Sequence, residues 1–330
     1  MQFGLFGGAR TQQRDDGAGD SQAYGSFIDY VIEAERLGFR SVFLVEHHFT
    51  GVGQLSASLT LLAYLAARTR SIRLGTAVIV LPWHNPVLLA EQAATLDLLS
   101  DGRLDFGVGK GYRASEFAGF RIGMDEATER FDEAIEVIRK AWTTPGRFSH
   151  RGKRWSFDDI VVEPAPLQRP HPPLWLAAGS PDSIRRAARE GYNLLLDQLG
   201  SVALTIERVA LFREECARIG RAYVPTMVGA TRALQIVRND AERQAAYETR
   251  ARVVRTIGDL ARGGGQLVAP EEDDAPLLGT PAEIVARLRK LRDGGVGNVL
   301  LVDPSANVAS LRAFAAEIMP SLTTDRAAAE

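Results

Sequence analysis

The sequence predicts an α/β protein built on one (β/α)8 barrel, the TIM-barrel fold. Eight short runs rich in β-branched, leucine and aromatic residues alternate with segments of helical hydrophobic spacing, at 2–6, 41–45, 73–80, 104–108, 174–178, 193–197, 226–237 and 298–302. Such alternation is typical of parallel βαβ units, and eight strands close a barrel. Of the 330 residues, 45% are hydrophobic, which is enough for one large core.

Apolar residues recur at helical spacing between these runs. The predicted helices are 24–37, 56–68, 87–99, 126–142, 182–190, 203–219 and 284–291. Before the last of them, Thr280 and Glu283 are spaced as a capping box, and Pro281 takes the first helical position. We therefore expect a helix between most pairs of strands.

Two segments follow neither period. Residues 145–173 and 262–278 are rich in glycine, proline and charged residues, so we expect insertions after strands 4 and 7 that act as lids. Residues 1–320 are expected to form the single barrel domain. The alanine-rich tail 321–330 is expected to be frayed.

Charge and composition exclude several classes of protein. The chain has 39 Lys and Arg against 41 Asp and Glu, a formal net charge of -2, so no positive field attracts nucleic acid. Cys216 is the single cysteine and cannot form an internal disulfide. The sequence contains no run of about 18 apolar residues, the pattern that predicts a membrane span. Residues 1–10 lack a signal-peptide pattern, so we expect a cytoplasmic protein.

The glycine-rich run 107–111 matches no known phosphate loop. Lys110 is followed by glycine rather than by Ser or Thr, which excludes a Walker loop, and the third glycine comes one residue too early for a Rossmann fingerprint. A tight turn at a strand end, which needs glycine backbone freedom, is the alternative to a cofactor role.

Metal and serine-hydrolase chemistry find no support in the sequence. The histidines lack ligand spacing and companion cysteines; they are His47, His48, His84, His150 and His171. The nucleophile elbow G-x-S-x-G is absent. We expect no metal site.

Four segments resemble bacterial luciferase α subunits and their relatives. Residues 37–49, which contain Glu-His-His-Phe, are similar to the second strand of that family. Residues 74–82, together with the His-any-Pro pattern that follows them, are similar to the third strand. Residues 102–111 are similar to the fourth strand, and 278–281 to the start of the last helix. The resemblance implies a barrel, a flavin bound at the C-terminal ends of the strands, and dimerisation.

The candidate catalytic residues lie at the end of the second predicted strand, on the face where barrel enzymes carry their sites. Two adjacent histidines alone are equally consistent with structural roles. Because neighbours on a strand point to opposite sides, only one can face the lumen, and we assign His47. The resemblance implies that Glu46 and His47 are catalytic, with His47 supporting the flavin hydroperoxide as acid, base or hydrogen-bond partner. His48 is expected to support them.

A phosphate site is expected after the fifth predicted strand. There Ser180 is spaced as an N-cap, and helix N-termini bind phosphate, so we assign the FMN phosphate to Gly179, Ser180 and Ser183. Simple capping is the alternative. By resemblance, Lys110 takes the place of a phosphate-binding arginine, and it keeps the charge but loses the bidentate fork.

Three further positions bear on the flavin. Ala77 and Val78 match the place where the family often has a cis non-prolyl peptide beneath the flavin ring, although an ordinary buried strand fits the sequence equally. Gly109 stands where luciferase has a reactive cysteine, and Gly179 where it has a glutamate. These two departures argue against assuming light emission or aldehyde preference.

The predicted function is a two-component monooxygenase. A separate flavin reductase supplies reduced FMN, and O2 then oxygenates a small organic substrate. The alternatives are a hydride-transferring oxidoreductase that uses a deazaflavin, and a non-catalytic flavin-binding protein. A homodimer is expected because residues 59–67 and 87–98 are apolar nearly all round, and helices of this kind are usually buried twice.

Overall fold

The computed structural model describes residues 1–11, 18–262, 273–303 and 305–323, and they form the predicted barrel. Its eight parallel strands are β1 (Gln2–Gly7), β2 (Ser41–Leu44), β3 (Arg73–Thr76), β5 (Leu104–Gly109), β8 (Leu174–Ala177), β9 (Asn193–Leu196), β10 (Val228–Ile236) and β12 (Asn298–Val302). They pair in the order β10-β12-β1-β2-β3-β5-β8-β9, and the pairing of β9 with β10 closes the ring.

By its internal contacts the chain divides into two compact units. Unit 1 comprises residues 1–7, 24–43 and 176–330, and unit 2 comprises residues 8–23 and 44–175. A single domain over residues 1–320 remains a prediction.

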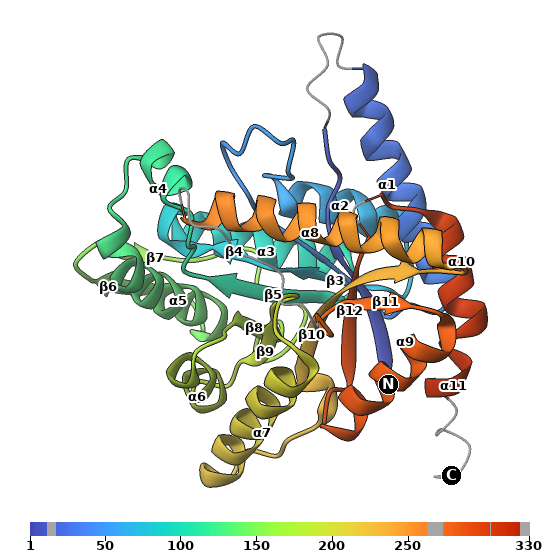
Figure 1. Cartoon of the computed structure of the whole chain (residues 1–330). Coiled ribbons are helices and arrows are strands. Elements are labelled where there is room, and N and C mark those ends of the chain that lie inside the picture. Colours follow the sequence, from blue (N-terminus) through green and yellow to red (C-terminus); the bar gives the residue numbers. More distant parts are fainter. Residues whose placement is uncertain (12–17, 263–272, 304, 324–330) are drawn as a thin grey trace. The chain divides into compact units, whose positions relative to one another are not determined.

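In unit 1, parallel strands around β12 form the core (Figure 1). Gln2 of β1 and Gly229 of β10 both pair with Asn298 of β12, and β11 (Leu277–Gly279) is added to β10. The helices of this unit are α1 (Ala18–Arg36, which begins in unit 2), α6 (Pro181–Arg189), α7 (Val202–Arg218), α8 (Asp240–Arg262), α9 (Pro281–Asp293), α10 (Val308–Glu317) and α11 (Pro320–Thr323). Phe3 and Phe314 meet edge to face, their ring centroids 5.0 Å apart, and join β1 to α10.

In unit 2, β3 and the short β4 (Ile79–Val80) both pair with β5. Its helices are α2 (Ser58–Arg68), α3 (Pro86–Leu99), α4 (Ala114–Phe120) and α5 (Ala127–Thr143). Helix α3 begins at Asn85, because the Asn85 side chain accepts hydrogen bonds from the N–H groups of Val87 and Leu88, and Pro86 has no N–H group that needs an acceptor.

The structure departs from the sequence expectations in several elements. The predicted strand 73–80 is divided into β3 and β4 at a cis peptide bond between Ala77 and Val78. Segment 145–173, expected to be irregular, contains an antiparallel hairpin of β6 (Phe148–Arg151) and β7 (Ser156–Ile160). Helices α4, α8 and α10 were not expected.

Two predicted segments lie partly outside the described residues. Of the expected insertion 262–278, residues 263–272 are outside, and residues 277–278 belong to β11. Of the expected frayed tail, residues 324–330 are outside, while residues 321–323 are helical in α11.

Candidate active site

The Glu46-His47-His48 segment lies just past the C-terminal end of β2, in unit 2. The strand ends at Leu44, so the alternation of side chains along a strand does not decide which histidine faces inward, and that argument was wrong. The backbone N–H of His47 donates to the carbonyl of Leu55 at 2.9 Å, which holds the segment in place. Its position at a strand end is the one predicted.

Glu46 is a buried carboxylate, 3% exposed, that collects hydrogen bonds from four groups. Its Oε1 accepts from Nε2 of His48 at 2.9 Å, from Nε2 of His84 at 2.7 Å and from Nε1 of Trp83 at 3.3 Å. Its Oε2 accepts from the N–H of Val80 at 2.9 Å. Burial raises the pKa of Glu46, but the bonds from His48 and His84 outweigh it and lower that pKa to about 2. Glu46 is therefore ionised and fixed.

His47 is held by a second buried carboxylate. Its Nδ1 lies 3.0 Å from Oε1 of Glu116, which also accepts from the backbone N–H of His48 at 2.9 Å. Burial lowers the pKa of His47 below the ordinary 6.5, the bond to Glu116 raises it, and the positive charge of Arg113 lowers it again. The imidazole is therefore neutral at pH 7.

A neutral His47 that donates from Nδ1 to Glu116 carries a free lone pair on Nε2. Within the described residues, no hydrogen bond involves Nε2, and the His47 side chain is 13% exposed. Such a nitrogen can accept a proton or a hydrogen bond from a ligand. Glu116 fixes the tautomer that makes this possible.

Aromatic rings surround the histidines. The ring of His48 meets Phe120 edge on at 4.9 Å and Trp83 at 6.0 Å, and Trp83 stacks on Phe120 at 5.2 Å. Phe49 is 60% exposed and lies so close to Gly119 that a Cβ there would meet its ring at 2.3 Å. This apolar wall can exclude water from a ligand placed beside His48.

The cis peptide Ala77–Val78 confirms the expectation drawn from the resemblance. The backbone N–H of Ala77 donates to the carbonyl of Leu44 at 2.7 Å, which joins this segment to the end of β2. A Cβ at Gly109 would lie 2.6 Å from Cγ2 of Val78. The structure thus brings Val78 and Gly109 into direct contact, and no side chain fits at position 109.

Lys110 is exposed at the end of β5. Its Nζ donates a hydrogen bond to Oγ1 of Thr128 at 3.3 Å. The contact is compatible with a second, anionic partner because an ammonium carries three donors.

Gly179, Ser180 and Ser183 lie in unit 1, at the start of α6. Oγ of Ser180 accepts from the N–H of Ser183 at 3.3 Å, and Oγ of Ser183 accepts from the N–H of Ser180 at 3.1 Å. This reciprocal pair is a capping box. Capping accounts for these contacts, and the phosphate role of the three residues stays a prediction.

Sequence reasoning missed the carboxylate that holds His47. Glu116 lies in α4, a seven-residue helix too short to show a hydrophobic period, and its two histidine partners are 68 and 69 residues away along the chain. His84 was noted in its His-any-Pro pattern, without a role. Among the described residues, no three His, Cys, Asp or Glu side chains are grouped to hold a metal ion, and no helix is long and apolar enough to cross a membrane.

Comparison with known proteins connects this arrangement to a family. Residues 1–298 match the model of the luciferase-like monooxygenases. The chain belongs to that family. Among relatives of this luciferase-like chain, the oxygenase component of the flavin-dependent trigonelline monooxygenase of Acinetobacter baylyi is 34% identical over 201 residues, which are 60% of this chain and 55% of the relative. The chain thus matches little more than half the length of such a curated relative.

Solved structures of luciferase-like fold cover nearly the whole chain. The monooxygenase RslO1 of Streptomyces bottropensis has a TM-score of 0.85 and 28% identity, over 97% of this chain and 99% of that one. An F420-dependent secondary alcohol dehydrogenase shares the fold at a TM-score of 0.75 and 16% identity, over 97% and 98%. A monooxygenase and an F420-dependent dehydrogenase therefore share this barrel fold.

Proposed function

We propose that this protein is a two-component monooxygenase that receives reduced FMN from a separate flavin reductase and uses O2 to oxygenate a small organic substrate. The relative from Acinetobacter is by name an oxygenase component and flavin-dependent, which supports this assignment. When bound, the flavin supplies the oxygen chemistry, and the residues of the chain orient it, exclude water and move a proton.

The observation that carries the proposal is the pairing of His47 with Glu116. A neutral imidazole, fixed through Nδ1 and free at Nε2, is the group that an oxygen-transferring site needs to accept or return a proton near neutral pH. Glu46 does not titrate near neutral pH, because its pKa is about 2. It acts by holding His48 and His84 in place.

The residues around the β3–β5 edge fit a planar ring system. Gly109 leaves no side chain against Val78, and the ring of His48 lies against an aromatic wall. We assign these positions to the isoalloxazine ring. The residues assigned to the phosphate are Lys110 of unit 2, whose ammonium group favours an anion, and Gly179, Ser180 and Ser183 of unit 1, at a helix N-terminus, which favours an anion too.

We also propose a homodimer formed through α2 and α3. Large apolar side chains remain exposed on these two helices: Tyr64 is 51% exposed, Leu88 54% and Leu99 62%. Side chains of this size on adjoining helices are typical of a surface that a second subunit covers.

Equilibrium binding separates the proposal from its alternatives. The proposed monooxygenase binds reduced FMN more tightly than oxidised FMN and more tightly than reduced deazaflavin, measured anaerobically by fluorescence titration. Preference for the deazaflavin would instead indicate a hydride-transferring oxidoreductase of the kind that shares this fold. Tight binding of oxidised FMN without any turnover would indicate a flavin-binding protein.

A further inference from the structure

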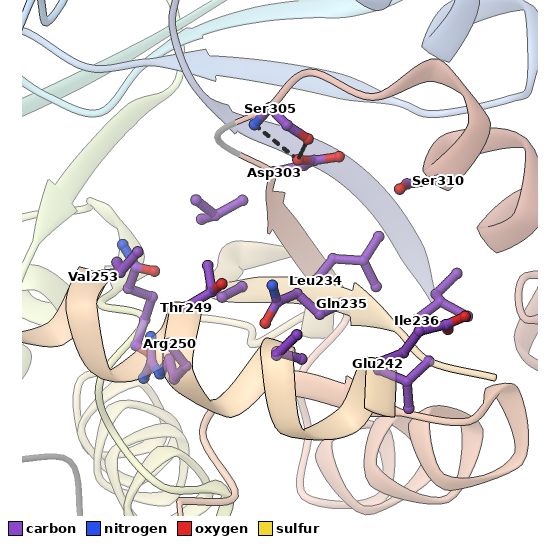
Figure 2. Close-up of a pocket in the computed structure, with 16 residues that line it drawn as sticks. Leu234, Gln235, Ile236, Glu242, Thr249, Arg250, Val253, Asp303, Ser305 and Ser310 are labelled. Carbon is purple, nitrogen blue, oxygen red and sulfur yellow. Dashed lines mark hydrogen bonds between the residues drawn. The ribbon is translucent and has the colours of Figure 1, made fainter. Parts of the chain in front are cut away.

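A cavity lies wholly within unit 1, between β10, α8 and the end of β12. Its volume is about 520 Å³, in the range of small-molecule sites. Figure 2 shows Thr249, Arg250 and Val253 on α8, and Leu234 and Gln235 on β10, around this space.

Most of the cavity wall is apolar. The apolar lining residues are Ala233, Leu234, Ile236, Val237, Ala245, Ala246, Val253 and Val302. Burial of a hydrocarbon body against such a wall removes apolar surface from water, which favours binding. The cavity therefore suits a ligand with an apolar body.

One end of this cavity carries buried polar atoms that have no hydrogen-bond partner among the described residues. Arg250 is 5% exposed; its Nε donates to Oδ2 of Asp273 at 2.8 Å and its Nη2 to the carbonyl of Gln198 at 3.2 Å. Within the part of the chain that the structure describes, its Nη1 is buried with no hydrogen-bond partner, and so is Oε1 of Gln198. Both residues line the cavity. A buried donor without an acceptor destabilises the protein, and an acceptor atom of a ligand at this end removes that penalty.

A second guanidinium increases the demand for an acceptor. Arg232 is fully buried in β10, and its Nε also has no hydrogen-bond partner in the described ranges. Burial lowers the pKa of Arg232 to about 10, and although Asp197 and Asp274 raise it, the positive charge of Arg250 lowers it further. An anion beside Arg250 thus relieves repulsion between two cations.

We propose that this cavity binds a small organic carboxylate, with its carboxyl group on Nη1 of Arg250 and its apolar body against β10 and α8. A phosphate dianion fits less well, because the same cavity is also lined by the carboxylates of Glu242 and Asp303. Those two carboxylates are already engaged by their own turns, Glu242 with the N–H of Arg238 and Asp303 with that of Ser305. The proposal does not depend on the oxygenase chemistry.

Calorimetric titration of the full chain tests this assignment. The probes are acetate, benzoate and octanoate, each paired with its uncharged amide, and inorganic phosphate. At least one carboxylate is expected to bind about 10-fold or more tightly than its amide and than phosphate, since hydrogen bonds to charged groups are worth that much. Binding of no carboxylate, equal binding of acid and amide, or tighter binding of phosphate overturns the proposal.

Variants locate the binding. Arg250→Gln is expected to weaken the binding of the carboxylate about 10-fold or more. Arg255→Gln, which changes an exposed arginine on the same helix, is expected to leave that binding unchanged. Val253→Phe fills the cavity from a half-buried position and is expected to weaken binding even if Arg250→Gln fails to fold. Unchanged affinity in a folded Arg250→Gln protein, or in Val253→Phe, contradicts the assignment.

Discussion

Oε1 of Glu116 lies 3.0 Å from Nδ1 of His47, although the two residues are 69 positions apart in the chain. The bond fixes the imidazole with Nε2 outward, and burial keeps it neutral. Glu116 is thus a positioning residue, and its removal has consequences that a purely structural role would not produce.

Glu116→Gln tests that role through a pH profile. The amide oxygen can still accept from Nδ1, but the negative charge that raises the pKa of His47 is lost. We expect a lower pKa for His47, so the acid limb of the rate profile moves to lower pH and the maximal rate falls about 10-fold or more. Glu136→Gln, on an exposed glutamate, is the control. An unshifted acid limb would count against the pairing.

His47→Ala tests the proton-transfer role itself. Folding and reduced-FMN binding should be nearly unchanged, while oxygenation slows by about 10² to 10⁴-fold, the usual contribution of a positioned acid or base. Rapid-mixing kinetics with reduced FMN provides the measurement. If the variant turns over at the parental rate, His47 is structural and the assignment is wrong.

Glu46 is expected to stabilise the fold in a pH-dependent manner. Its pKa is about 2 in the folded protein against an ordinary 4.5, so its contribution is present above pH 4.5 and is lost as the pH falls from 4.5 towards 2. The shift corresponds to about 3 kcal/mol. Glu46→Gln should therefore lower the free energy of unfolding by about 3 kcal/mol or more at pH 7 and by less at pH 3. Denaturant unfolding at both pH values tests this, and an equal loss at both contradicts it.

Lys110 is expected to bind the flavin phosphate. Lys110→Ala should weaken the binding of FMN by roughly 10 to 150-fold. The binding of riboflavin, which lacks the phosphate, should be unaffected. Lys110→Arg should bind FMN at least as well, because the guanidinium fork suits phosphate. Ser180→Ala should weaken the binding of FMN by about 1 kcal/mol, partly because the cap of the helix is lost. Equal weakening of FMN and riboflavin by Lys110→Ala places the phosphate elsewhere.

The dimer proposal is tested by charge placed on the exposed helix faces. Leu88→Glu and Leu99→Glu should convert a dimer at micromolar concentration into a monomer, because a carboxylate buried in an apolar interface is costly. Leu167→Glu, at a leucine that is 51% exposed but outside α2 and α3, is the control. Sedimentation of the parent protein as a monomer at that concentration excludes the dimer.

The barrel could be predicted from the sequence because strands and most helices carry regular hydrophobic periods. Helix α8 was missed because charged residues interrupt its apolar stripe, as in Arg250 and Arg252, and α4 because it is too short. The strand end with Glu46 and His47 was found from its motif. Its partner Glu116 could not be found, because that contact depends on tertiary packing of distant segments.

The central claim is best tested by mixing the anaerobic complex of this protein and reduced FMN with oxygenated buffer, and by recording flavin absorbance in a stopped-flow instrument. The account predicts that flavin reoxidation is much slower than for free reduced FMN, and that His47→Ala abolishes most of this delay. Reoxidation of the parent complex at the rate of free reduced FMN would contradict it.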